Sequence, residues 1–163
     1  MESCEKTRLT FRPARADDLE AIVGLLADDK LGAACEDASA PLNPAYKAAF
    51  SAIEADGNQL LAVVEQDGAD GEREIVGCLQ LCFIPSLAKR GSWRGQIESV
   101  RIAASQRGQG LGETILDWAI RQCKARGCKA VQLTTDKARP DAMAYYESKG
   151  FAASHDGLRL TLD

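Results

Sequence analysis

A strand-like segment, a glycine-rich turn and an amphipathic helix follow one another directly. This order of elements is the feature that most limits what the chain can fold into. Residues 96–102 alternate apolar and polar side chains, and glycines follow at Gly108, Gly110 and Gly112. Glycine lacks a Cβ atom, so its backbone can adopt positive φ angles and approach an anion closely. The first turn of the next helix adds unpaired N–H donors and a positive dipole end. The pattern predicts a phosphate-binding turn.

The helix after the turn is predicted at residues 110–126 and the next strand at 130–135. An i, i+4 stripe predicts the buried face of this helix, and its members are Leu111, Ile115, Ala119 and Cys123. The two strands should lie parallel, joined by a right-handed crossover. A short helix at 140–149 and a final strand within 151–162 are expected to complete the chain.

The first half predicts a strand at residues 9–12, a helix at 19–26, a loop at 28–42 and a helix at 44–55. Two strand-like runs, 59–64 and 74–84, flank the turn signal at 66–71 and predict a hairpin. A basic connection at 85–95 leads to the strand before the glycines. The whole predicts a mixed α/β fold.

Composition limits the classes of function. With 163 residues, 45% of them apolar and 27% charged, the chain suits a single domain with one core. A net charge of -4 offers no general attraction to nucleic acid or to anionic membranes. The N-terminal residues are polar, and the longest uncharged run, 75–88, is too short to span a bilayer. These features predict a cytoplasmic protein with neither nucleic acid nor membrane as a partner.

Six cysteines and the lone His155 give little support to a metal site. No C-x-x-C pair occurs, and we expect reduced, mostly buried thiols and no metal. A single histidine excludes Ser-His or Cys-His catalysis unless the last strand reaches the site.

A glycine-rich turn alone can be an ordinary tight turn, and other readings of this one remain open. The run lacks the lysine of a nucleoside-triphosphate P-loop, and its spacing differs from G-x-G-x-x-G. Asp136, after the second strand, could hold a ribose hydroxyl, so a dinucleotide-binding enzyme stays as an alternative.

The runs RGQGLG at residues 107–112, after ESVRI at 98–102, and AMAYYESKGF at 142–151 resemble the GNAT superfamily of acetyl-CoA-dependent N-acetyltransferases. The resemblance is close over residues 96–151. It implies a mixed, mostly antiparallel sheet flanked by about four helices, with a splayed gap between parallel strands near Val100 and Leu133. One acetyltransferase domain, 1–163, would comprise an acceptor-side half, 1–95, and an acetyl-CoA-binding half, 96–163.

The resemblance also implies a cofactor site. Backbone N–H groups would hold the pyrophosphate of coenzyme A, and the residues are Arg107, Gly108, Gln109, Gly110, Leu111 and Gly112. The strand containing Val100 and Ile102 would bond the pantetheine arm, and the Val100 N–H would polarise the thioester carbonyl. Many relatives have an asparagine where this chain has Arg139, which could instead contact a cofactor phosphate or lie in solvent.

Acetyl transfer requires a neutral amine, and alkyl ammonium groups, with a pKa of about 10.4, need a base to deprotonate them. Glu98 is the predicted base, acting directly or through water, although it could be a surface glutamate. Tyr146 is the predicted proton donor to the departing thiolate, although it could be a core aromatic. The competing function is a non-catalytic acyl-CoA-binding sensor or scaffold.

The acceptor is predicted only as a primary amine of a small molecule or peptide. An acidic group favours a cationic acceptor, and its members are Asp28, Asp29, Glu36 and Asp37. A basic group favours an acceptor with a carboxylate, and its members are Lys89, Arg90, Arg94 and Arg101. The resemblance is also compatible with a homodimer.

Overall fold

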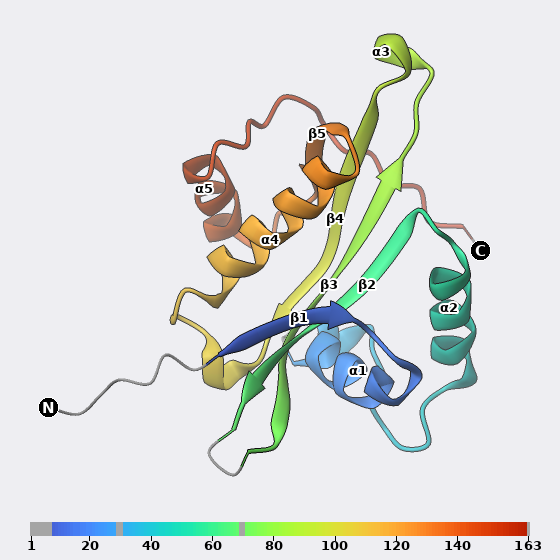
Figure 1. Cartoon of the computed structure of the whole chain (residues 1–163), viewed down its shortest axis with the longest axis vertical. Helices are drawn as coiled ribbons and strands as arrows, with labels where there is room; N and C mark the ends of the chain where they lie inside the picture. Colours follow the sequence, from blue (N-terminus) through green and yellow to red (C-terminus); the bar gives the residue numbers. More distant parts are fainter. Residues whose placement is uncertain (1–7, 29–30, 69–70, 163) are drawn as a thin grey trace, which may run out of the picture.

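Five strands form one mixed sheet in the computed structural model, which describes residues 8–28, 31–68 and 71–162 (Figure 1). In sheet order they are β1 (Leu9–Pro13), β2 (Gln59–Asp67), β3 (Arg73–Ile84), β4 (Trp93–Ile102) and β5 (Cys128–Leu133). The first four are antiparallel neighbours, and β5 runs parallel to β4. The predicted mixed sheet, its hairpin and its parallel pair are confirmed.

Five α-helices and three short 3-10 turns connect the described strands. They are α1 (Leu19–Ala27), α2 (Pro44–Ala55), α3 (Ala88–Gly91), α4 (Leu111–Ala125), α5 (Pro140–Ser148), η1 (Ala16–Asp18), η2 (Gly32–Ala34) and η3 (Ala104–Gln106). Helices α4 and α5 lie on one side of the sheet, and α1 and α2 on the other (Figure 1). Four main helices therefore flank the sheet as expected, and α3 is a single turn within the predicted basic connection.

The face of the sheet under α4 is apolar. Leu79, Leu81 and Ile97 pack there against the helix. The predicted stripe on α4 is buried, since Ile115, Ala119 and Cys123 have no exposed surface and Leu111 is 5% exposed. A Cβ placed on Gly95 would lie only 2.2 Å from the Cys123 sulfur, so glycine at this position lets α4 approach β4 closely.

Helix α1 covers only one end of the opposite face. Ile22 and Leu25 pack against Val63 and Cys78 in a second, smaller cluster. Farther along β3, Gln80 and Cys82 on this face are half-exposed. The middle of the sheet is therefore less covered on this side than under α4.

An ion-pair network joins β1, η1 and β2 on the α1 side. The Arg12 guanidinium donates to Asp18 at 2.7 Å and 3.0 Å and to Glu65 at 2.8 Å. These contacts lower the pKa of both carboxyl groups, although burial opposes the shift. The network connects the first strand to the start of α1.

The final strand predicted within residues 151–162 is wrong, because the structure has no strand there. The alternating leucines that suggested it, Leu158, Leu160 and Leu162, are 98%, 84% and 82% exposed. Alternation predicts which side chains share a face, but a strand also needs a neighbour to accept its backbone hydrogen bonds. No described strand pairs with this segment.

Candidate active site

The glycine-rich turn leaves the N-terminal end of α4 uncapped. Gly108 and Gly110 have φ angles of +76° and +83°, a left-handed conformation that glycine adopts without a Cβ clash. No side chain caps the helix, and its first backbone hydrogen bond runs from the Thr114 N–H to the Gly110 carbonyl at 3.2 Å. The N–H groups of residues 111–113 therefore point out of the helix end, as helix geometry requires.

Arg107 links this turn to α1. Its guanidinium donates to the carbonyl and to the carboxylate of Asp28, both at 2.9 Å, and its Nε donates to the Ile102 carbonyl at 3.3 Å. The Arg107 backbone N–H donates to the Ala104 carbonyl at 3.3 Å. Of the predicted pyrophosphate-binding residues, Arg107 thus already has partners within the protein.

The edge of β4 has no strand partner among the described residues just before the turn, although the Val100 carbonyl accepts a hydrogen bond from the Arg101 guanidinium at 3.0 Å. Pairing with β5 ends at Ile97 opposite Leu133. The Ala103 N–H donates to the Val76 carbonyl of β3 at 2.9 Å. Because successive residues of a strand direct their backbone groups to opposite sides, those of Val100 and Ile102 face the gap beyond β5. An extended ligand arm could pair with this edge.

A bulge in β4 separates the candidate base from that edge. Ser99 has a φ angle of +53°, and the register with β3 shifts between Cys78 and Gln80. An extra residue of this kind bends a strand and redirects the side chains after it. Glu98, exposed and paired with Gln80, lies on the face opposite Ile97. Beyond the bulge, Val100 packs against the α4 side.

A narrow slot of about 130 Å³ lies between β4, α4 and α5. Its lining includes Val100, Ile102, Gly112, Tyr145 and Tyr146. This volume suits a thin extended chain and is too small for a whole nucleotide, which needs several hundred Å³. The slot thus brings together the predicted edge, the start of the predicted helix and the predicted acid.

Tyr145 is a residue that sequence reasoning missed. Its hydroxyl would lie 3.8 Å from a Cβ placed on Gly112, and it lines the slot beside Tyr146. Only Tyr146 of the two adjacent tyrosines is predicted to have a functional role, although Tyr145 is 36% exposed. The one available signal was its position next to Tyr146 on a short helix.

Tyr146 is half-buried against aromatic neighbours. Its ring makes edge contacts with Tyr145 and Phe151, with centroids 5.3 Å and 5.8 Å away. Burial raises the pKa of Tyr146 above the usual phenol value, although the charges of Arg139 and Arg101 oppose the shift. At neutral pH the side chain is therefore a protonated phenol, the form that can donate a proton.

Two residues near the gap have local roles. Arg139 is the half-buried N-cap residue of α5, and its N–H donates to the Asp136 carbonyl at 2.9 Å. The Asp136 carboxylate accepts a hydrogen bond from the Ala138 N–H at 2.8 Å. Asp136 therefore closes a turn, which reduces the support for a ribose-binding carboxylate.

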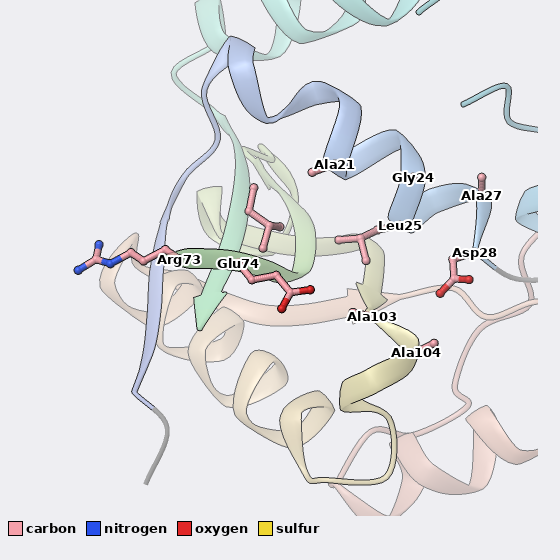
Figure 2. Close-up of a pocket in the computed structure, with 10 residues that line it drawn as sticks. Ala21, Gly24, Leu25, Ala27, Asp28, Arg73, Glu74, Ala103 and Ala104 are labelled. Atoms are coloured by element: carbon pink, nitrogen blue, oxygen red, sulfur yellow. The ribbon is translucent and has the colours of Figure 1, made fainter. Parts of the chain in front are cut away.

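An open depression of about 740 Å³ lies on the α1 side of the sheet (Figure 2). Its lining comes from α1, the start of β3 and η3, and Figure 2 shows the Arg73 side chain pointing away from it. Neither Glu98 nor Tyr146 lines this depression. It is therefore separate from the slot that contains the candidate acid.

The charged groups considered for the acceptor divide by position. Asp28 binds Arg107, the Glu36 carboxylate accepts from the Tyr46 hydroxyl at 2.7 Å, and Asp37 accepts from Ser39. Asp29 lies outside the described residues. Of the basic group, Lys89 and Arg90 lie in α3 and Arg94 lies near the start of β4, whereas Arg101 lies near its end. Arg101 is thus the basic residue nearest in the chain to Glu98.

The described cysteines are free thiols, and Cys4 lies outside the described residues. Burial raises the pKa of Cys78 to about 12 and that of Cys123 to about 11. Among residues 8–28, 31–68 and 71–162, no group of three or more His, Cys, Asp or Glu side chains could hold a metal ion. Within the same ranges, no helix is long and apolar enough to cross a membrane.

Comparison with known proteins decides the family. The sequence profile of the acetyltransferase (GNAT) family matches residues 21–151, most of the chain. The chain belongs to the GNAT acetyltransferase family. This confirms the resemblance found in the two glycine-containing motifs, and the mixed sheet agrees with it.

Two individual relatives share 30% and 32% of the aligned residues with this chain. Aminoalkylphosphonate N-acetyltransferase of Salmonella typhimurium is 30% identical over 82 residues, 50% of this chain and 53% of that protein. A probable glucosamine 6-phosphate N-acetyltransferase of rice (Oryza sativa) is 32% identical over 121 residues, 72% of this chain and 68% of that protein. The matched part of the chain therefore spans about half of the first relative and about two thirds of the second.

A solved structure is more similar. The transcriptional regulator from Bacillus halodurans C-125 has a TM-score of 0.87 and 46% sequence identity, covering 95% of this chain and all of that one. The shared fold extends across nearly the whole chain.

Proposed function

We propose that this chain transfers the acetyl group of acetyl-CoA to a primary amine, by direct attack within a ternary complex. The observation that carries the proposal is the departure of β4 from β5 immediately before the glycine turn. It leaves the Val100 and Ile102 backbone edge, the α4 N–H groups and Tyr146 around one slot. Family membership supports acetyl-CoA as the donor.

In this proposal the turn binds the pyrophosphate of coenzyme A. The N–H groups of residues 108–112 and the positive end of α4 supply the donors, as they do at other anion-binding helix starts. Arg107 contributes indirectly, because its bonds to Asp28 hold the turn against α1. The pantetheine arm pairs with the free edge of β4, and the Val100 N–H donates to the thioester carbonyl.

Glu98 removes the proton from the amine, and the amine nitrogen attacks the thioester carbon. The tetrahedral intermediate then collapses, the carbon–sulfur bond breaks, and Tyr146 donates its proton to the departing thiolate. The raised pKa of Tyr146 supports this role, because the phenol remains protonated at neutral pH. Holding both reactants in order makes a covalent enzyme intermediate unnecessary.

The names of the relatives support an acceptor that combines an amine with a phosphorus oxyanion. One relative is named for aminoalkylphosphonates and the other for glucosamine 6-phosphate. Arg101, paired opposite Cys78 on the Glu98 side of the sheet, supplies a positive charge for such a group, although its guanidinium already donates to the Val100 carbonyl. The local partners of Asp28, Glu36 and Asp37 weaken the case for a cationic acceptor.

A non-catalytic acyl-CoA-binding module is the second candidate. It is favoured by the name of the Bacillus halodurans structure, a transcriptional regulator. In that case acetyl-CoA would bind in the same slot, and Glu98 and Tyr146 would have structural roles alone.

The deciding experiment measures release of the coenzyme A thiol with 2-aminoethylphosphonate, glucosamine 6-phosphate, spermidine and a lysine peptide. We expect turnover with an amine that carries a phosphorus oxyanion, and a loss of roughly 100-fold in Glu98→Gln. The control is Glu54→Gln, on the exposed side of α2. Acetyl-CoA binding without turnover of any amine would favour the binding module, and binding of NAD in its place would favour a dinucleotide enzyme.

A further inference from the structure

Four glutamines lie in a row across the face of the sheet opposite α4, one on each of four adjacent strands. They are Gln59 on β2, Gln80 on β3, Gln96 on β4 and Gln132 on β5, and we call them the glutamine row. Their common face follows from the strand register. Cys82 pairs with both Gln59 and Gln96, Gln96 pairs with Gln132, and Gln80 lies two residues before Cys82.

The row is linked in pairs by hydrogen bonds. The Gln80 amide donates to the Gln59 carbonyl oxygen at 2.7 Å, and the Gln132 amide donates to the Gln96 carbonyl oxygen at 2.6 Å. The carbonyl oxygens of Gln80 and Gln132 and the amide nitrogen of Gln96 make no hydrogen bond within the described part of the chain. The row therefore offers both acceptors and a donor to a ligand.

The candidate base lies within this row. Glu98 pairs directly with Gln80 and lies two residues after Gln96 on the same face. Cys82 lies on the same face, opposite Gln96. Burial raises the pKa of the Cys82 thiol, and the negative charge of Glu98 raises it further. An amine that reaches Glu98 from this side must therefore lie over the glutamines.

A neutral amide donates and accepts hydrogen bonds, as a hydroxyl group does, and it offers no ionic attraction. An apolar acceptor in contact with the row would displace water from these amides and leave them without hydrogen-bond partners, which lowers its affinity. We infer that the acceptor is a primary amine bearing several hydroxyl groups, which the glutamine row binds while the amine faces Glu98. This inference rests on the proposed function and specifies its substrate class.

Two amines of similar ring size test the inference. Glucosamine carries hydroxyls around its amine, and cyclohexylamine carries none. Each is titrated calorimetrically into the protein saturated with coenzyme A, and its acetylation is followed by thiol release with acetyl-CoA. The variant is Gln80→Leu, which keeps the side-chain size, and the matched control is Gln122→Leu on α4.

We expect the wild type to prefer glucosamine, and Gln80→Leu to weaken glucosamine binding and raise its KM roughly tenfold. The KM of cyclohexylamine should change less than about twofold in the same variant. Gln122→Leu should leave the KM of both amines unchanged. A shared loss for both amines, or no loss for either, would show that the row only supports the sheet and would overturn the inference. If Gln80→Leu lowers Tm markedly, Gln132→Leu on the edge strand replaces it.

The acetyltransferase activity and the hydroxyl-binding role of the glutamine row can be contradicted separately. Glucosamine binding that depends on Gln80, without acetylation, would overturn the proposed function and support the row as a hydroxyl-binding site. Acetylation of phosphorylated amines with no preference for glucosamine over cyclohexylamine would support the proposed function and overturn the row as a hydroxyl-binding site.

Discussion

The two faces of the sheet use the same strands but different chemistry. Under α4 the side chains of the sheet are apolar, and apart from Tyr145 and Tyr146 of α5 the groups left for a ligand are backbone atoms of β4 and of the glycine turn. On the α1 side, the middle strands carry glutamines, Glu98 and Arg101. The comparison shows that the α4 face offers mainly backbone groups, which suit the binding of the acetyl donor. The other offers particular side chains, suited to selecting an acceptor.

Substitutions should therefore have different consequences on the two faces. A change on the α4 side should affect folding, acetyl-CoA binding or proton donation to the thiolate, whereas a change on the opposite face should affect acceptor binding or local stability. Four substitutions test this separation.

The largest effect is expected from Gly95→Ala, because the new Cβ would lie 2.2 Å from the Cys123 sulfur and force α4 away from β4. Overpacking of this kind should lower the free energy of unfolding by about 3 kcal/mol, measured by urea denaturation. Gly57→Ala is the control, since nothing lies within 4 Å of a Cβ there. Equal stability of the two variants would show that α4 does not depend on this close approach.

Tyr146→Phe should lower kcat roughly 100-fold while acetyl-CoA affinity stays within about twofold, because it removes a proton donor and keeps the ring. Steady-state kinetics and calorimetry measure the two quantities. Tyr46→Phe, far along the chain, controls for loss of a phenol. An unchanged kcat, with the chemical step rate-limiting, would assign Tyr146 to packing alone.

Gly110→Ala should weaken acetyl-CoA binding roughly 30-fold, because alanine disfavours the φ angle of +83° that opens the turn. Gly127→Ala is a matched control, since Gly127 has a φ angle of +77° at the other end of the same helix. Both variants should lose similar stability, but only Gly110→Ala should lose affinity by calorimetry. Parallel losses of affinity would contradict binding at the turn.

Asp18→Asn should show the smallest effect, about 1.5 kcal/mol at neutral pH, from loss of the ion pair with Arg12. Because Arg12 lowers the pKa of Asp18, this stabilisation is fully present above the usual carboxyl pKa of 3.8 and is lost as pH falls below 3.8 and through the lowered pKa. The difference in urea stability between the two proteins should therefore be constant near pH 7 and shrink as the pH is lowered below 3.8. Asp117→Asn, on the exposed side of α4, is the control, and a difference that does not shrink at all in acid would contradict the ion-pair explanation.

The sequence predicted the α4 side well because its signals are local. Glycines that need positive φ angles, and the stripe from Leu111 to Cys123, act within a few residues of one another. The glutamine row escaped notice because it depends on register between strands up to 73 positions apart, from Gln59 to Gln132. The bond between Arg107 and Asp28 joins positions 79 apart. The final strand was wrong because alternation does not reveal whether a neighbouring edge exists.

Hydrogen–deuterium exchange of the wild type, with and without acetyl-CoA, tests the central claim most directly. The account predicts slower exchange in peptides covering residues 98–102 and 108–113, whose backbone N–H groups line the gap and the turn, and unchanged exchange in β1. The same peptides should not respond to NAD. Protection confined to other segments, or no protection at saturating acetyl-CoA, would contradict the assignment of this slot as the acetyl-CoA site.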